Sequence, residues 1–155
     1  TVRATAEIDE NYKFLGWFVG GEQVGKYYDY EFTVDGEDVS VEARTARFRS
    51  VVAKSCEGAE VTFDKKEFYD GLTVTAKITV DPAFKLTEFK KNGVDVDERE
   101  FTFVVGGGDV TFTAKTARLR SVTVVTADGV EEAAFDAKEF YDGLTVGLTV
   151  SVGPD

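Results

Sequence analysis

Aromatic residues gathered in one stretch are the part of this sequence best suited to contact a ligand. They are Trp17, Phe18, Tyr27, Tyr28 and Tyr30. Flat rings with a polar tip stack on sugars and on protein surfaces when a loop exposes them. One interpretation is a ligand-contact surface here, for a sugar or a protein. In the alternative interpretation Trp17 and Tyr30 are core residues, and Tyr27 and Tyr28 are ordinary loop residues.

This sequence lacks the residues on which enzymes most often rely for catalysis. The chain contains no histidine, which is the usual general base and zinc ligand of enzymes. Its few serines lack the neighbouring base that would activate a hydroxyl. Its many carboxylates fall at turns or alternate along exposed strand faces. We therefore predict that the protein is not an enzyme and has neither catalytic residues nor a cofactor.

Two further chemistries have weaker signals. Cys56 and Gln23 are the single cysteine and the single glutamine, so a thioester between them is one option and a partly buried thiol near a turn is the other. The acidic turn at residues 35–38 offers oxygen ligands that suit calcium, but its spacing is not that of an EF-hand. The aligned turn at residues 106–109 is Gly-Gly-Gly-Asp. We favour the plain thiol and a solvated turn, and predict no metal site.

Charge excludes two classes of partner. The chain has 29 acidic and 18 basic residues, a net charge of −11 and an isoelectric point near 4.5. Such a surface repels the phosphate backbone of nucleic acids and anionic lipid headgroups. No stretch approaches 18 consecutive apolar residues, so we predict neither nucleic-acid binding nor membrane insertion.

An internal repeat organises the whole chain. The phrase Lys-Glu-Phe-Tyr-Asp-Gly-Leu-Thr-Val occurs at residues 66–74 and again, unchanged, at residues 138–146. Residues 45–51 return as residues 116–122, with Leu119 in place of Phe48. Two matches at nearly one offset indicate a tandem repeat of about 72 residues. We expect the phrase to be structural and to form a hinge between the two halves of each module, with its glycine at positive φ.

The repeat can be divided in two ways. The preferred frame has a complete module at residues 46–116, between partial modules at 1–45 and 117–155. The other frame has whole units at 1–72 and 73–144 and a leftover strand at 145–155. In the preferred frame, the partial modules could complement one another between molecules by strand addition.

Alternation of apolar and polar residues predicts β-strands throughout. Residues 1–9 and their counterparts at 73–81 both alternate with the period of a half-buried strand. Gly20-Gly21 and Asn92-Gly93 suit the tips of two hairpins with type I′ turns. No stretch has the spacing of an amphipathic helix. We predict an all-β protein of small tandem modules, with about six short strands in each repeat.

Several motifs together resemble the divergent internalin B-repeat modules of bacterial surface proteins. They are Tyr12-x-Phe14-x-Gly16-Trp17, Tyr30-x-Phe32-Thr33-Val34, Asp38-Val39-x-Val41-x-Ala43 and Tyr69-Asp70-Gly71-x-Thr73-Val74-x-Ala76. The second copy departs from the first motif, because Glu88-Phe89 replaces Gly-Trp. The resemblance implies β-grasp-like or β-sandwich-like modules, strung in tandem on an extracellular adhesin that is attached to the bacterial cell wall. It implies no catalysis.

Three functional hypotheses follow from the sequence. In the first, the segment is a stalk or spacer whose partners are neighbouring modules of the same polypeptide. In the second, it binds a host glycan or protein through the aromatic stretch. In the third, it associates with itself by strand complementation.

Overall fold

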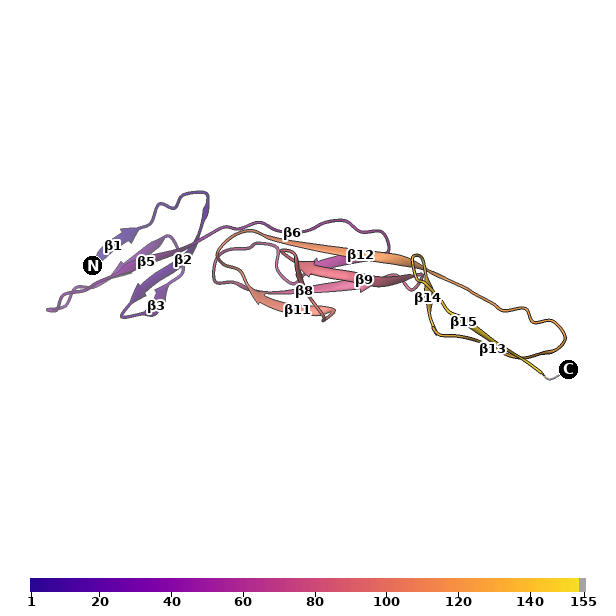
Figure 1. Cartoon of the computed structure of the whole chain (residues 1–155). Helices are drawn as coiled ribbons and strands as arrows, with labels where there is room; N and C mark the ends of the chain where they lie inside the picture. The colour runs from indigo at the N-terminus through magenta and orange to yellow at the C-terminus, as the bar shows by residue number, and fades with distance from the viewer. Residues whose placement is uncertain (154–155) are drawn as a thin grey trace. The chain divides into compact units, whose positions relative to one another are not determined.

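The computed structural model describes residues 1–153, and this part of the chain is built from β-strands without a helix (Figure 1). The all-β prediction is confirmed. The first strands are β1 (Val2–Thr5), β2 (Tyr12–Val19), β3 (Glu22–Gly25), β4 (Asp29–Phe32), β5 (Glu42–Arg47), β6 (Val51–Ala53) and β7 (Ala59–Phe63). The others are β8 (Thr73–Val80), β9 (Phe84–Lys91), β10 (Val94–Asp95), β11 (Glu100–Val104), β12 (Val110–Arg120), β13 (Val130–Phe135), β14 (Phe140–Tyr141) and β15 (Leu148–Val152). Within residues 1–153 there is accordingly no helix long and apolar enough to cross a membrane.

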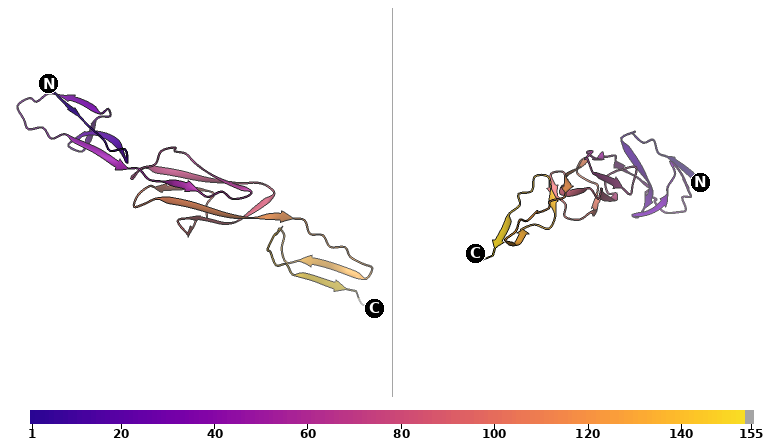
Figure 2. Two further views of the ribbon diagram at one scale, coloured as in Figure 1. Left: turned by 90° about the horizontal axis from the view of Figure 1, so that it is seen from above. Right: turned by 90° about the vertical axis from the view of Figure 1, so that its right-hand side faces the viewer.

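Small sheets, not one continuous sheet, make up the fold. The two three-stranded sheets have the orders β3-β2-β5 and β11-β8-β7. A five-stranded sheet has the order β10-β9-β12-β14, with β6 also paired to β12. The two-stranded sheets are β1-β4 and β13-β15. Both views of Figure 2 show β13 and β15 side by side at the yellow end of the chain.

Two hairpins form where the sequence predicts them. In β2-β3, Gly20 and Gly21 have φ angles of 58° and 88°. In β9-β10, Asn92 and Gly93 have φ angles of 48° and 80°. A type I′ turn needs positive φ at both central residues, which glycine and asparagine tolerate. The turn residues therefore account for the position of each hairpin tip.

The same strand pairing occurs twice, about one repeat apart. Tyr12 lies opposite Arg47 in the β2-β5 pair, and Phe84 lies opposite Arg118 in the β9-β12 pair. These are aligned positions in the sequence repeat. Each pair contains an irregularity of register at the same place, between Phe14 and Gly16 in the first and opposite the Lys115–Thr116 step in the second. Similar sequences thus fold to similar ladders in both copies.

The hydrophobic core lies in the middle of the chain. Its buried side chains, apart from Trp17, all fall within residues 46–116. They are Ala46, Val51, Val74, Ala76, Ile78, Phe89, Phe103, Val105, Val110 and Phe112. On β8 the buried residues alternate with more exposed ones, as the period of a strand requires.

By internal contacts the chain divides into two compact units, and each is discontinuous in sequence. The first contains Thr1–Val52, Phe63–Ala76 and Phe101–Val110. The second contains Ala53–Thr62, Lys77–Glu100 and the chain from Thr111 onward. Each unit combines parts of more than one sequence repeat. The repeat frame with a complete module at 46–116 stays a prediction, because compact units and sequence repeats are different divisions of the chain.

Candidate functional site

The predicted aromatic surface is built on β2 and on the loop that joins β3 to β4. Trp17 is buried, and its indole Nε1 donates a hydrogen bond of 3.0 Å to the carbonyl oxygen of Tyr27. This bond satisfies the only polar atom of the indole and holds the loop against β2. Tyr27 and Tyr28 remain exposed, with 69% and 59% of their surfaces accessible.

Five rings form a continuous series, which we call the aromatic ladder: Tyr28, Phe14, Trp17, Tyr30 and Phe32. The rings of Tyr28 and Phe14 are nearly parallel, and their centroids are 5.3 Å apart. Phe14 meets Trp17 edge to face at 6.0 Å. Tyr30 is stacked between Trp17 and Phe32, at 6.3 and 5.8 Å. These separations lie in the range that favours aromatic pairs.

Two glycines allow close approaches beneath this surface, of rings at Gly25 and of a backbone carbonyl and the Gln23 side chain at Gly16. A Cβ atom on Gly25 would lie 2.9 Å from Cδ2 of Tyr30 and 3.3 Å from Cδ1 of Trp17. Gly16 has φ of 124°, and a Cβ there would lie too close to the carbonyl oxygen of Gly25 and to the Gln23 amide. The Gln23 amide instead donates a hydrogen bond of 2.9 Å to the Leu15 carbonyl. The side chain of Gln23 is thus part of the scaffold of this surface.

A groove of about 560 Å³ opens beside the ladder. It is lined by Gln23, Val24, Gly25, Lys26, Tyr27, Asp29, Tyr30 and Glu31. The Lys26 ammonium lies 5.2 Å from the centre of the Tyr27 ring. Hydrogen bonds from Thr5 and Arg3 hold the pKa of the Asp29 carboxyl below its usual range, so this carboxylate stays charged at neutral pH. The groove therefore offers the exposed Tyr27 ring, a cation and carboxylates to a ligand.

The five predicted contact residues have different positions in the structure. Tyr27 and Tyr30 line the groove, and the buried Trp17 supports it. Tyr28 is exposed but stacks on Phe14 instead of lining the groove. The ring of Phe18 is covered by the guanidinium of Arg44, at 4.3 Å. Ligand contact by these five residues stays a prediction.

The sequence prediction missed two rings of the ladder and six of the eight residues that line the groove. Phe14 and Phe32 complete the ladder, and Lys26 lines the groove. Phe14 and Phe32 could have been found, because they alternate with neighbouring aromatic residues along predicted strands. Lys26 carries no such signal. In the second copy Leu86 replaces Phe14, and the counterpart of Trp17 is Phe89, which stacks on Phe112 at 5.6 Å in the core.

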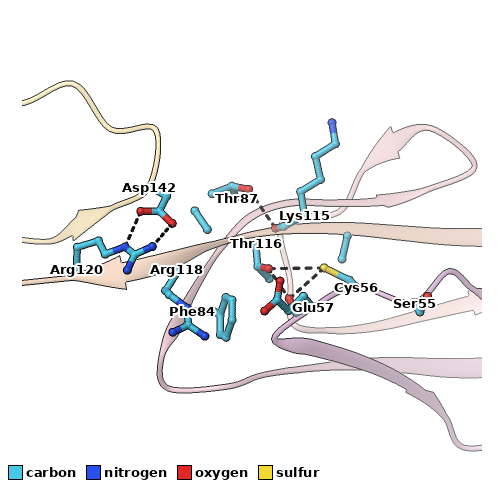
Figure 3. A pocket seen from close by; sticks show the side chains of 12 residues that line it. Ser55, Cys56, Glu57, Phe84, Thr87, Lys115, Thr116, Arg118, Arg120 and Asp142 are labelled. Carbon is cyan, nitrogen blue, oxygen red and sulfur yellow. Dashed lines mark hydrogen bonds and ion pairs between the residues drawn. The ribbon is translucent and has the colours of Figure 1, made fainter.

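A second groove, of about 770 Å³, surrounds the single cysteine (Figure 3). Cys56 is half-buried at a turn, as one of the two sequence interpretations expects. Its Sγ lies 3.7 Å from the Thr116 hydroxyl and 3.5 Å from the Glu57 carbonyl oxygen. The guanidinium of Arg118 lies over the Phe84 ring, at 5.3 Å. In the part of the chain that the structure describes, no three His, Cys, Asp or Glu side chains are placed to hold a metal ion.

The repeated phrase takes part in a set of contacts that we call the junction, which occurs twice. In the first junction, Arg49 donates two hydrogen bonds to Asp70, at 2.7 and 2.8 Å. In the second, the aligned Arg120 donates two to Asp142, at 2.6 and 2.8 Å. These bonds hold the pKa of both aspartates below the ordinary value. A planar guanidinium fits a carboxylate in this bidentate manner and fixes its orientation.

A lysine completes each junction. Lys13 pairs with Glu67 at 2.6 Å, and its ammonium lies 6.0 Å from the centre of the Tyr69 ring. The aligned Lys85 pairs with Glu139 at 2.5 Å and lies 5.6 Å from the Tyr141 ring. Hydrogen bonds to the two glutamates raise the pKa of both lysines.

Backbone hydrogen bonds support the junctions. The amide of Asp70 donates to the carbonyl of Arg47 at 2.9 Å, and that of Asp142 donates to Arg118 at 3.0 Å. Gly71 and Gly143 follow with φ of 90° and 88°, so the expected positive φ is confirmed. In each copy the repeated phrase therefore contacts both strands of one pair. These strands are β2 and β5 in the first copy, and β9 and β12 in the second.

Comparison of the chain with protein-family models, with curated proteins and with solved structures finds no match.

Proposed function

We propose that this chain is a non-catalytic spacer, a tandem-repeat segment of a protein on the bacterial cell surface. In this role, small β-modules hold another part of the polypeptide away from the cell wall. The partners of each module are its neighbours in the same chain. The resemblance to divergent internalin B-repeats supports the location, and the junctions support the mechanical role.

The observation that carries this proposal is the recurrence of one set of contacts at successive repeat boundaries. In the frame with a complete module at 46–116, Lys13 precedes the first boundary and Glu67 follows it. Lys85 and Glu139 have the same relation to the second boundary. A spacer acts through its length and stiffness, and contacts that cross every boundary restrict bending there. The repeated phrase at residues 66–74 is thereby restrained by side-chain and backbone contacts, and does not act as a flexible hinge.

Distance measurements between spin labels test the mechanical role. Labels on cysteines introduced at Glu22 and Lys66, which lie in the same compact unit on either side of the first boundary, would report that boundary in a Cys56→Ser background. We expect a narrow distribution for the parent chain and a clearly broader one for the Lys13→Gln variant, because the ion pair with Glu67 across the boundary is lost. Arg44→Gln is the matched control, since Arg44 pairs with Glu42 outside the junction. Equal widths for the parent and Lys13→Gln would refute a stiffening role.

Flanking sequence tests the location. The proposal expects a secretion signal upstream and a wall-sorting signal downstream in the gene that encodes this segment. A cytoplasmic gene product with neither signal would contradict the cell-surface role.

The aromatic groove favours a second candidate function, binding of a host glycan or protein. Its support is an exposed Tyr27 at the edge of the groove; the aligned hairpin of the second copy also borders a groove, of about 440 Å³, but no tyrosine lines it. Glycan and host-protein arrays would provide the target. The double variant Tyr27→Ala/Tyr28→Ala should then lose at least about tenfold in affinity, because each exposed ring is a large contact. Tyr12→Ala is the control, as an exposed tyrosine that does not line the groove. Unchanged affinity in the double variant would exclude this site.

A further inference from the structure

The outer edge of β4 carries backbone groups without a partner. β4 pairs with β1 on one side, and in the part of the chain that the structure describes no strand pairs with its other side. The amide of Ala6 donates a hydrogen bond of 2.9 Å to the Tyr28 carbonyl. Because successive residues of a strand direct their backbone groups to alternate sides, Tyr30 also faces β1, whereas Asp29 and Glu31 face away. The N–H and C=O groups of Asp29 and Glu31 can therefore pair with another strand.

The same edge is open in the middle of the sequence, where chain precedes and follows it. β11 is the counterpart of β4 and the last strand of the sheet β11-β8-β7. The Val105 amide donates a hydrogen bond of 2.8 Å to the Leu72 carbonyl, so Val105 and Phe103 face β8 and Thr102 faces away. An unpaired outer edge at this strand is thus a property of the repeat, and does not depend on where the sequence begins.

The aromatic groove runs along the outer edge of β4. Its lining includes Asp29, Tyr30 and Glu31 and no residue of β1. Neighbouring side chains of a strand point to opposite faces, so a groove that all three residues line follows the edge between the two faces. The lining continues over residues 23–25 of β3, which is itself the outer strand of β3-β2-β5. An extended chain in the groove would therefore meet the unpaired backbone groups of β4.

The side chains along this edge indicate the chemistry of the chain that would fit. On one face of β4, Asp29 pairs with Arg3, whereas Glu31 makes no hydrogen bond or ion pair within residues 1–153. On the other face, the Tyr30 ring belongs to the aromatic ladder. The lining has these two carboxylates and the ammonium of Lys26, in a chain of net charge −11. Opposite charges stabilise a strand pair when they lie across from one another, so a basic residue suits the position opposite Glu31.

We propose that the groove binds an extended protein segment as an added strand beside β4, and that basic and apolar residues alternate in this segment. Backbone hydrogen bonds to Asp29 and Glu31 provide affinity, and the alternating side chains provide specificity. The basic side chains lie on the face of Glu31, and the apolar ones lie on the face of Tyr30. Such binding rests on the second candidate function proposed above, and its partner is a protein segment and not a glycan.

N-methylated peptides test whether the backbone of the partner pairs with β4. The probe is a fluorescent, blocked peptide of alternating lysine and valine, and its affinity for the parent chain is measured by fluorescence anisotropy. In an extended peptide the lysine N–H groups point to one edge and the valine N–H groups to the other. Methylation of either set blocks one edge and leaves the charge unchanged. One methylated peptide should bind at least about tenfold more weakly than the unmethylated peptide, and the other should stay within about twofold, because a single edge pairs with β4. Equal affinities of the two methylated peptides would overturn the proposal.

Proline variants test the same pairing from the side of the protein. Glu31→Pro removes an N–H group from the outer edge without removing a bond to β1, and should lower the affinity for the peptide at least about tenfold. Glu100→Pro is the matched control, because it removes the same charge at the aligned position of β11. No residue of β11 lines the groove beside the second hairpin, so this control should stay within about twofold of the parent chain. Circular dichroism would check that both variants are folded, and equal affinities of the two would contradict an added strand.

Sugars distinguish this proposal from the wider binding function. One outcome is a glycan that binds the parent chain and loses affinity in Tyr27→Ala/Tyr28→Ala, while the peptide shows no binding up to about 1 mM. That outcome would overturn the added strand and leave the second candidate function in place. Absence of binding by both the peptide and the glycans would overturn both.

Discussion

Residues 46–116 and the two segments that flank them contain closely similar residues, yet nearly all of the buried hydrophobic side chains lie in only one of these regions. Val74, Ala76 and Val110 are buried, while Val2, Leu148 and Val39 at aligned positions are exposed. The difference is not in the strand pattern, which the copies share. It lies in whether a partner strand from a distant part of the sequence is present. Alternation of apolar and polar residues favours a strand, but the strand forms only where a neighbouring strand pairs with it.

Core truncation should separate the two regions most strongly. Phe112→Ala removes a fully buried ring and should lower the free energy of unfolding by about 3–5 kcal/mol, because a cavity is left behind. Its counterpart Val41 is only half-buried, and Val41→Ala should cost less than about 1 kcal/mol. Urea denaturation followed by circular dichroism would measure both. Equal losses would mean that the outer segment has a core of its own.

A pair of aligned glycines gives the next contrast. Gly58 has φ of 72°, and a Cβ there would lie against the Phe84 ring. Gly58→Ala should therefore combine backbone strain with overpacking, at about 2–4 kcal/mol. Gly129 has φ of 87° with no atom within 4 Å of such a Cβ, so Gly129→Ala should cost only the strain, about 1–2 kcal/mol. Thermal unfolding of both variants would compare them, and a larger loss at Gly129 would contradict the contrast.

Amide hydrogen exchange would sharpen the comparison at the level of single backbone bonds. The Val110 amide is bonded to Ser50 in the core, and the Val39 amide has no such bond in the described chain. We expect Val110 to exchange at least about 100-fold more slowly than Val39, after correction for intrinsic rates. The measurement belongs at low protein concentration, where association cannot protect Val39. Similar protection at both amides would refute the difference in pairing.

The smallest expected difference is between the two junctions. It concerns how the pKa of the aspartate in each junction responds to salt. Asp70 and Asp142 both have a lowered pKa in the folded chain, so each ion pair stabilises the fold above the usual aspartate pKa. That contribution is lost as the pH falls through the lowered value. The Arg49–Asp70 side chains are 22% and 33% exposed, against 54% and 53% for Arg120–Asp142. High salt should therefore raise the pKa of Asp142 more than that of Asp70 in an NMR titration. An equal or reversed response would show that exposure does not set the strength of these pairs.

The aromatic surface was only partly predictable from the sequence. The excess of rings was visible, and so was its absence from the second copy. The order of the rings was not, because stacking between Tyr28 and Phe14 depends on how the loop after β3 folds back on β2. The position of Phe18 beneath Arg44 depends in the same way on the register between β2 and β5. Long-range register cannot be read from one strand alone.

The junctions were likewise only partly predictable from the repeated phrase. Its letters identified a repeat and predicted a glycine at positive φ. They could not identify Arg49 and Lys13 as its partners, because these residues lie 21 and 54 positions from Asp70 and Glu67. Only folding brings such distant charges together, where the phrase is held in place at several points.

The sequence by itself determined the class of structure, the strand periods and the two hairpin tips. Those features depend on alternation and on glycine or asparagine at positive φ, which are local properties of the chain. Tertiary structure decided which of the similar segments became complete strands. Thr73 begins β8, whereas the identical Thr145 lies outside a strand. The reason is physical: the hydrogen bonds and the burial that stabilise a strand come from its neighbours, and the residues of the strand cannot supply them.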